Sequence, residues 1–343
     1  MNRQVRTIDA HTAGQALRLV IDGFPTPPGR TMLDKCSWVK KHQDRVRRAL
    51  LCEPRGHQDM CGAILTEPVL PGSHAGLVFM DTDGYATMCG HAVIAVTTIA
   101  LERGLLMPGG DGRSIVYDTP AGVVRANATV VSAGPHALAT DARRCRVASV
   151  TFLNVPSFVL HAGLEVPLGA RRIRADVAFG GAFYAIVDSE GAGLPLDVAH
   201  VPELRRAGRE IKRAIDEAHS IVHPLDQSLH GIYGTIFTAP PNDHRAHLRN
   251  VAVCGDQQVD RSPSGTGTAA VMAVLDAMGL LAEDEPFVHE SLVGMRFSGR
   301  LTGRTQVGDY QAIVSAIEGS AWITGEHTFF IDDDDPLKDG FRM

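Results

Sequence analysis

The chain of 343 residues has no apolar run long enough to cross a membrane. Its longest such run, around Ala92 to Leu101, is about half of what a bilayer span requires. The first residues lead straight into the polar segment Asp9-Ala10-His11-Thr12 and lack the apolar region of a secretory signal. We therefore expect a cytoplasmic protein for which a membrane is not a partner.

A surplus of positive charge is also missing. The formal net charge is -6, and the 33 lysines and arginines are scattered among 39 acidic residues. Without a basic face that could release counterions from a phosphate backbone, nucleic acid is not an expected partner. Apolar residues make up 44% of the chain, which is ordinary for a globular protein, and the length favours about two domains.

Residues for cofactor, disulfide and metal chemistry are few or poorly spaced. Pyridoxal enzymes need a lysine for the Schiff base, and four of the five lysines fall in charged segments typical of exposed helices. The lysines are Lys35, Lys40, Lys41 and Lys212 in those segments, and Lys338. The six cysteines show no paired disulfide spacing, and the 15 histidines show no zinc-binding pattern. We expect free thiols, no metal and no organic cofactor.

What the sequence does contain is an internal repeat. Residues 88–106 match residues 263–281 at the single offset that separates Cys89 from Ser264. Each segment has a glycine-containing start, a run too apolar for a surface helix, and a glycine where the residue after a helix end belongs. Both segments are predicted to be buried helices, and a repeat at this distance indicates two related halves.

Short β-rich runs accompany both helices. One covers residues 76–80 before the first helix, and another covers residues 250–254 before the second. The other runs are residues 16–21, 114–117, 147–153, 183–187 and 311–314. We predict an α+β fold of two pseudo-symmetric halves, each with a mostly antiparallel sheet wrapped around a central helix. The first half takes residues 1–142 plus 325–343, and the second takes residues 143–324.

The two helix starts carry groups that a core helix does not need. A helix N-terminus offers unpaired amides and partial positive charge, which bind a carboxylate and favour the thiolate of Cys89. Glycines allow four amides to approach one small anion, those of Gly90, His91, Gly265 and Thr266. A carboxylate held there leaves its α-carbon beside Cys89 and Ser264, where amide donors can stabilise the charge that develops when the α-proton leaves.

These motifs resemble the proline racemase superfamily of proline racemases, hydroxyproline epimerases and 3-hydroxyproline dehydratases. The resemblance is strongest at Met88-Cys89-Gly90-His91 and residues 255–268, with support at residues 9–14, 54–57, 154–158 and 180–185. It implies a diaminopimelate-epimerase-like fold, a homodimer, an imino acid substrate and no metal or organic cofactor. It also implies residue roles: Cys89 accepts the proton, Gly90 and His91 bind substrate, Asp260 contacts the ring nitrogen, and Gly265 with Thr266 completes the carboxylate cradle.

Ser264 stands where racemases of this family carry a second cysteine. Inverting a stereocentre with two bases needs a second usable acid, and an unassisted serine hydroxyl is too weak. A dehydratase needs only Cys89, because the reaction ends when hydroxide leaves the β-carbon; Ser264 would then position or protonate that leaving group. The sequence favours a trans-3-hydroxy-L-proline dehydratase that yields Δ1-pyrroline-2-carboxylate, with a 4-hydroxyproline 2-epimerase or proline racemase as the alternative.

Plainer interpretations of the same residues remain open. Ser264 can be a helix cap alone, His91 a packed histidine, and Asp260 a member of a surface ion pair. Cys61 is expected to be buried, and Cys254 to be a small core residue that is nevertheless the best substitute for a second thiol. A catalytically silent protein that binds imino acids would keep the same carboxylate cradle.

Overall fold

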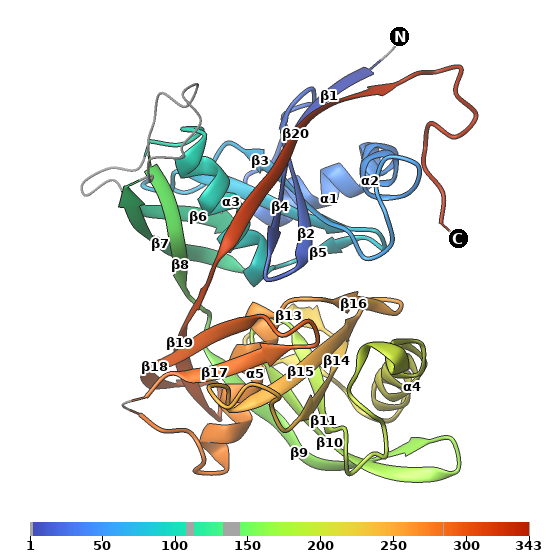
Figure 1. Ribbon diagram of the computed structural model, residues 1–343, viewed down its shortest axis with the longest axis vertical. Helices are drawn as coiled ribbons and strands as arrows, with labels where there is room; N and C mark the ends of the chain where they lie inside the picture. The colour runs from blue at the N-terminus through green and yellow to red at the C-terminus, as the bar shows by residue number, and fades with distance from the viewer. Residues whose placement is uncertain (1–2, 108–112, 133–144, 284, 343) are drawn as a thin grey trace. The chain divides into compact units, whose positions relative to one another are not determined.

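The structure is a computed structural model that describes residues 3–107, 113–132, 145–283 and 285–342. The chain forms two compact units (Figure 1): unit 1 is Met1–Phe152 with Glu318–Met343, and unit 2 is Leu153–Ile317. The divisions predicted from the sequence lie at residues 142/143 and 324/325. The difference arises because strands β8, Cys145–Leu153, and β19, Tyr310–Gly319, continue up to or through the boundaries, so no linker marks them in the sequence.

Unit 1 is built around helix α3, Gly90–Glu102. Its strands are β1 (Arg3–Thr12), β2 (Gln15–Asp22), β3 (Cys61–Thr66), β4 (Ala75–Asp81), β5 (Tyr85–Ala86), β6 (Ser114–Thr119), β7 (Gly122–Ser132), β8 and β20 (Ala321–Ile331). Strand β1 pairs antiparallel with β2 and β20, β3 pairs antiparallel with β4, and the parallel pairs are β2 with β3 and β4 with β6. Helices α1 (Met32–His42) and α2 (Asp44–Leu51) pack beside β4.

Unit 2 is built around helix α5, Gly265–Ala277. Its strands are β9 (Ser157–Leu168), β10 (Arg171–Phe179), β11 (Phe183–Asp188), β12 (Val222–His223), β13 (Asp226–His230), β14 (Ile232–Ala239), β15 (Leu248–Cys254), β16 (Gln258–Asp260), β17 (Phe287–Ser291), β18 (Arg296–Val307) and β19. Adjacent strands pair antiparallel from β9 to β11 and from β14 to β16, whereas β11 with β14 and β15 with β17 are parallel. The turn η1 (Val198–His200) leads into helix α4, Val201–Ala218, which packs on β9, β14 and β15.

The internal repeat predicted from the sequence is confirmed in the two central helices. Helices α3 and α5 are each 13 residues long and begin after Cys89 and Ser264. Each helix is followed, two residues after its last helical residue, by a glycine. These are Gly104 and Gly279, whose φ angles of 62° and 70° suit glycine. In each case the amide of the next residue bonds the carbonyl five residues earlier, at 2.9 and 2.8 Å, which closes both helices with the same Schellman-type geometry.

The strands around the helices repeat as well. In unit 1 the order is β3, β4, β5, α3 and β6, and in unit 2 it is β14, β15, β16, α5 and β17. In both, the strand after the helix returns parallel to the second strand of the set. Even a side-chain contact recurs, because His74 and His247 each accept a backbone amide of that returning strand at Nδ1, at 3.0 and 2.9 Å. The predicted α+β halves with mostly antiparallel sheets are therefore present.

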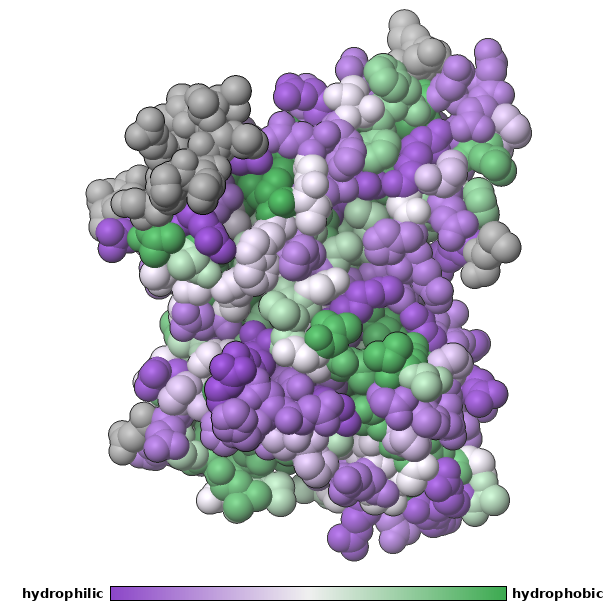
Figure 2. Space-filling model, viewed as in Figure 1, coloured by the Kyte–Doolittle hydropathy of each residue, from purple (hydrophilic) through white to green (hydrophobic). Residues whose placement is uncertain are grey.

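Burial follows the predicted helices with one exception. Helix α3 is buried from Gly90 to Ala100 and α5 from Gly265 to Val274. The face of the molecule in Figure 2 is mainly hydrophilic.

The expectation that Lys35 is exposed is wrong: it is only 5% exposed and donates through Nζ to the Glu67 carbonyl at 2.6 Å. It shares the buried face of α1 with Met32 and Val39, where its alkyl stem packs while the ammonium finds a backbone acceptor. None of the helices in the described part of the chain is both long and apolar enough to cross a membrane.

Candidate functional site

Cys89 is the residue from which helix α3 starts. Its backbone is extended, with φ of -146° and ψ of 101°, and its carbonyl accepts the amide of Val93 at 3.0 Å. Its half-buried thiol makes no capping bond to the helix. Instead, Sγ lies 3.3 Å from Nε2 and 3.6 Å from Nδ1 of His91. The sulfur therefore meets an imidazole at the first turn of a buried helix, where the helix dipole is positive.

His91 is fixed from both its main chain and its ring. The residue is 6% exposed, and its carbonyl accepts the hydroxyl of Thr12 at 2.8 Å. The ring also interacts with the thiol of Cys61, the first residue of β3. The backbone bond joins β1 to α3 across a long stretch of sequence. The ring is thus buried and in contact with Cys89 at the same time.

Cys61, the first residue of β3, is half-buried rather than buried as predicted, although Met60 before it is only 3% exposed. Its sulfur accepts a bond from Nε2 of Gln15 at 3.4 Å. Desolvation nevertheless raises the pKa of the Cys61 thiol to about 11, and the nearby His91 side chain lowers it only in part. At neutral pH Cys61 is thus a neutral thiol beside His91, and it does not compete with Cys89 as a base.

Ser264 occupies the corresponding start of helix α5 in unit 2. Its Oγ accepts the amide of Gly267 at 3.2 Å, so the predicted helix cap is present. A Cβ on residue 267 would lie 2.8 Å from that oxygen, which explains why glycine stands there. Ser264 has φ of 63° and ψ of 119°, a conformation that costs a non-glycine residue about 1–3 kcal/mol and that concentrates at functional sites.

A set of buried polar side chains holds this strained residue in place. The carbonyl of Pro263 accepts Nδ2 of Asn250 at 2.8 Å and the hydroxyl of Thr268 at 3.2 Å. The Thr268 hydroxyl in turn lies 2.9 Å from Nδ1 of His289, which is fully buried. Asn250 and His289 were not predicted from the sequence, because only the pairing of β15 with β17 brings them to the start of α5. Thr268 lay within the sequence motif but was assigned no role.

Asp260 and Thr266 flank Ser264. Oδ1 of Asp260, the last residue of β16, accepts the amide of Ser262 at 2.8 Å and so shapes the turn into α5. The Thr266 hydroxyl lies 2.7 Å from the hydroxyl of Tyr184 on β11, and both residues are buried. Burial raises the pKa of the Tyr184 phenol well above its usual value, so that it remains protonated. Tyr184 is a further residue whose role sequence reasoning did not assign.

The predicted site residues therefore form two groups, one in each unit. Unit 1 carries Cys89, Gly90 and His91, and unit 2 carries Asp260, Ser264, Gly265 and Thr266. Cys254 lies buried in β15, as predicted. Cys36, Cys52, Cys61, Cys89 and Cys254 are free thiols. Within the ranges that the structure describes, no three His, Cys, Asp or Glu side chains group as metal ligands.

The protein has a duplicated α+β fold. It carries a cysteine at one buried helix start and a serine at the matching start. The family described as "Proline racemase" matches residues 7–342, and the chain belongs to this family of enzymes. Trans-3-hydroxy-L-proline dehydratase from Bacillus cereus is 41% identical over 337 residues, 98% of this chain and 97% of the relative. Proline racemase from Clostridioides difficile is 38% identical over 343 residues, 100% and 99% of the two chains.

The fold also matches solved structures of this family. A hydroxyproline epimerase from Agrobacterium vitis, with bound trans-4-OH-L-proline, superposes with a TM-score of 0.87 at 29% identity. The match covers 99% of this chain and 96% of that one. The predicted fold class, of the diaminopimelate-epimerase type, is confirmed.

The buried His289 predicts a pH dependence of stability. Desolvation lowers its pKa from 6.5 to about 3, so the folded state binds fewer protons than the unfolded state at mildly acidic pH. Its contribution is complete above pH 6.5 and is lost as the pH falls toward 3. Between pH 7.5 and 5.0 urea unfolding should show a loss of about 2 kcal/mol from this group.

The variant His289→Asn keeps a polar group near the position of Nδ1 but does not titrate. We expect its free energy of unfolding to fall less over this pH range, by the same ~2 kcal/mol. His244, whose side chain is 92% exposed, provides the control, and His244→Asn should keep the wild-type slope. Identical slopes for His289→Asn and the wild type would show that His289 does not carry the effect.

Proposed function

We propose that the protein is a cofactor-independent trans-3-hydroxy-L-proline dehydratase that forms Δ1-pyrroline-2-carboxylate. The observation that carries the proposal is the difference between the two helix starts: α3 offers a thiol beside an imidazole, whereas α5 offers a hydroxyl. The dehydratase from Bacillus cereus, 41% identical across nearly the whole chain, supports the same reaction. An imino acid is thus the proposed substrate.

The substrate carboxylate would be held by the first amides of the two helices. Helix geometry leaves these donors outside the intrahelical ladder, and they carry the positive end of the helix dipole. Gly90, Gly265 and Thr266 supply the amides, together with His91, and Asp260 binds the ring nitrogen. When the α-proton leaves, negative charge spreads onto the carboxylate, where these fixed donors stabilise it more than in the ground state.

Cys89 is the proposed base for the α-proton. The thiolate would be stabilised by the start of α3 and by a hydrogen bond from His91, whose Nε2 lies 3.3 Å away. As the sulfur takes the proton, the electrons of that C–H bond form the double bond between the α- and β-carbons. The β-carbon–oxygen bond breaks, and the released hydroxide and the proton on Cys89 together make one water. The resulting enamine tautomerises to Δ1-pyrroline-2-carboxylate.

Ser264 would assist the departure of hydroxide. Its oxygen accepts the amide of Gly267, so the helix cap uses a lone pair and not the hydroxyl proton. The hydroxyl also interacts with the side chain of Tyr184, and it would donate to the leaving oxygen in place of that contact. A hydrogen bond to the leaving oxygen needs no alkoxide, whereas proton abstraction by serine would. Capping and catalysis by Ser264 are therefore compatible.

An epimerase or racemase is the second candidate. It is supported by the 38% identity to proline racemase from Clostridioides difficile and by the likeness to the hydroxyproline epimerase structure. It would require Ser264, or another group, to return a proton to the face opposite Cys89.

Solvent deuterium separates the two reactions. We expect the purified enzyme to convert trans-3-hydroxy-L-proline to Δ1-pyrroline-2-carboxylate in D2O, with loss of substrate measured by NMR. An epimerase would instead accumulate deuterium at the α-carbon of both epimers. Interconversion of 4-hydroxyproline epimers without any pyrroline carboxylate from the 3-hydroxy substrate would refute the dehydratase assignment.

Substituting the serine tests its position as the determinant of the reaction. Ser264→Cys should gain epimerisation at the α-carbon and lose about tenfold in dehydration, because a thiol can deliver a proton to the second face. Adding Cys89→Ser to this variant should abolish both activities, which controls for contaminating enzymes. An unchanged ratio of the two products in Ser264→Cys would show that residue 264 does not select the reaction.

A further inference from the structure

In both units a tight turn precedes the segment that carries the site. In unit 1 the turn of residues 81–84 joins β4 to β5, and Cys89 follows β5 by a few residues. In unit 2 the turn of residues 255–257 joins β15 to β16, and Asp260 is the last residue of β16. The two turns occupy equivalent places in the repeat. The conformation of each turn therefore positions the short strand that follows it, β5 or β16, and the segment that leads on to helix α3 or α5.

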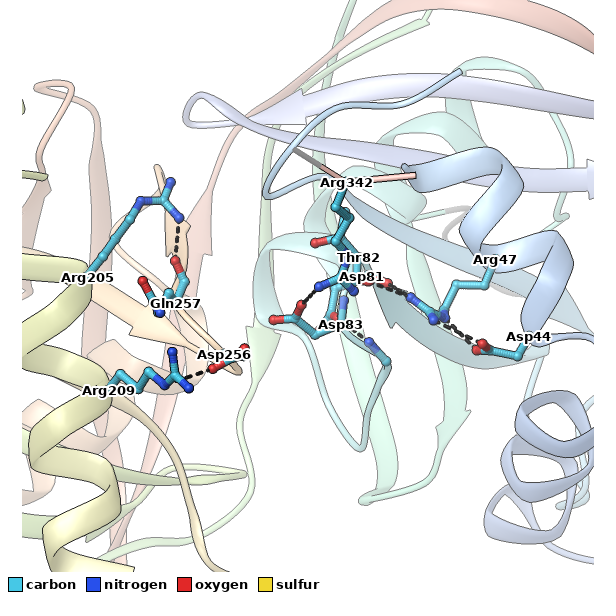
Figure 3. Close-up of polar contacts among 11 residues, drawn as sticks. Asp44, Arg47, Asp81, Thr82, Asp83, Arg205, Arg209, Asp256, Gln257 and Arg342 are labelled. Atoms are coloured by element: carbon cyan, nitrogen blue, oxygen red, sulfur yellow. Dashed lines mark hydrogen bonds and ion pairs between the residues drawn. The ribbon is translucent and has the colours of Figure 1, made fainter. Parts of the chain in front are cut away.

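The unit 2 turn is held by three cationic side chains of helix α4, two of which, Arg205 and Arg209, are drawn in Figure 3. The guanidinium of Arg205 donates through Nη1 to the carbonyl of Gln257. One helical turn further on, Nε of Arg209 lies 3.2 Å from Oδ1 of Asp256. Nζ of Lys212 donates to the carbonyl of the first turn residue at 3.3 Å. Each residue of the turn is thus held by a different side chain from one face of α4.

Helix α4 is a rigid base for these contacts. A Cβ on its Gly208 would lie 2.8 Å from Cβ of Val253, so the helix backbone packs directly on β15. Thr235 of β14 donates through its hydroxyl to the Gly208 carbonyl at 2.9 Å. The turn itself is strained, because Gln257 has φ of 95° and such a conformation in a non-glycine residue persists only when its surroundings hold it.

The unit 1 turn is held in the same manner by a buried arginine of α2 (Figure 3). Arg47, which is 4% exposed, donates through Nη1 to the carbonyls of Asp81 and Thr82 at 2.7 and 2.8 Å. Its Nε bonds Oδ1 of Asp44 at 2.7 Å, which fixes the guanidinium. On the next residue of the turn, the carboxylate of Asp83 pairs with Arg342.

We propose that Arg205 and Arg47 are positioning residues of the reaction, each fixing through main-chain carbonyls the turn that leads to the site residues of its own unit. The roles rest on the proposed function, in which Asp260 binds the ring nitrogen and Cys89 removes the proton. In this proposal each arginine acts through the protein backbone and not through the substrate. Release of the unit 2 turn should disturb substrate binding by Asp260, and release of the unit 1 turn should disturb proton removal by Cys89.

The two arginines should therefore affect different kinetic constants. Arg205→Met should raise KM for trans-3-hydroxy-L-proline about fivefold and leave kcat within about twofold, because binding is weakened more than chemistry. Arg47→Met should lower kcat about tenfold with KM within about twofold. Arg205→Lys retains a donor for the Gln257 carbonyl and should recover most of the lost affinity.

Arg213→Met is the matched control for α4. Arg213 lies on the same helix, its side chain is 77% exposed, and it pairs with Glu217 at 3.3 Å; its loss should leave KM and kcat unchanged. Thermal unfolding of every variant checks the fold. Should Arg47→Met fail to fold, Arg205→Met and Arg205→Lys still decide the unit 2 contact.

Binding of L-proline, which has no hydroxyl to eliminate, separates this inference from the dehydratase assignment. Calorimetry should show L-proline binding about fivefold more weakly to Arg205→Met than to the wild type, whichever reaction the enzyme catalyses. The proposal is overturned if Arg205→Met matches Arg213→Met in KM and in L-proline affinity. It is also overturned if Arg205→Met loses only thermal stability.

Discussion

The sulfur of Cys89 at the first turn of a buried helix is the constraint on which the rest depends. Helix α3 is apolar on every side, so the strands packed around it fix its position. The first turn of the helix is held in place with the rest of it. The thiol is left without a capping role and meets the ring of His91. Thr12 ties the backbone of that histidine to β1. The proposed base is thus held by the central helix of unit 1 rather than by a surface loop.

Duplication supplies a second helix start with different chemistry. Helices α3 and α5 share length, C-terminal geometry and neighbouring strand order, yet the residue before the helix is Cys89 in one and Ser264 in the other. The serine accepts a helix amide and adopts a positive φ, held by the buried contacts of Pro263, Thr268 and His289. The duplicated architecture, with a thiol at one helix start and a hydroxyl at the other, is the basis for the proposed dehydratase reaction, which removes a proton and does not return it.

The sequence was sufficient for the features that repeat locally. The repeated apolar runs and their closing glycines predicted α3 and α5, and the β-rich runs around them proved to be strands. The predicted boundaries of the units differ from the observed ones because strands β8 and β19 run across the observed boundaries, where no linker marks them in the sequence. Lys35 was misplaced because its apolar stem, rather than its charge, decides which face of α1 it joins.

Contacts between residues distant in the sequence could not be foreseen. The bond from Thr12 to His91, the pairing of Thr268 with His289, and the grip of Arg205 on Gln257 all depend on strand pairing and helix packing. No single residue type or spacing in the sequence predicts these contacts. They decide how firmly the site is held, whereas the local motifs decide which chemical groups it contains.

The most direct test of the central claim is alkylation of the thiols with iodoacetamide, followed by peptide mapping and activity measurement on the same samples. If Cys89 is the base, loss of activity follows modification of Cys89 alone, and L-proline slows both in parallel. The half-buried Cys36 and Cys61 serve as internal references. Full activity in protein whose Cys89 is completely alkylated would contradict the mechanism.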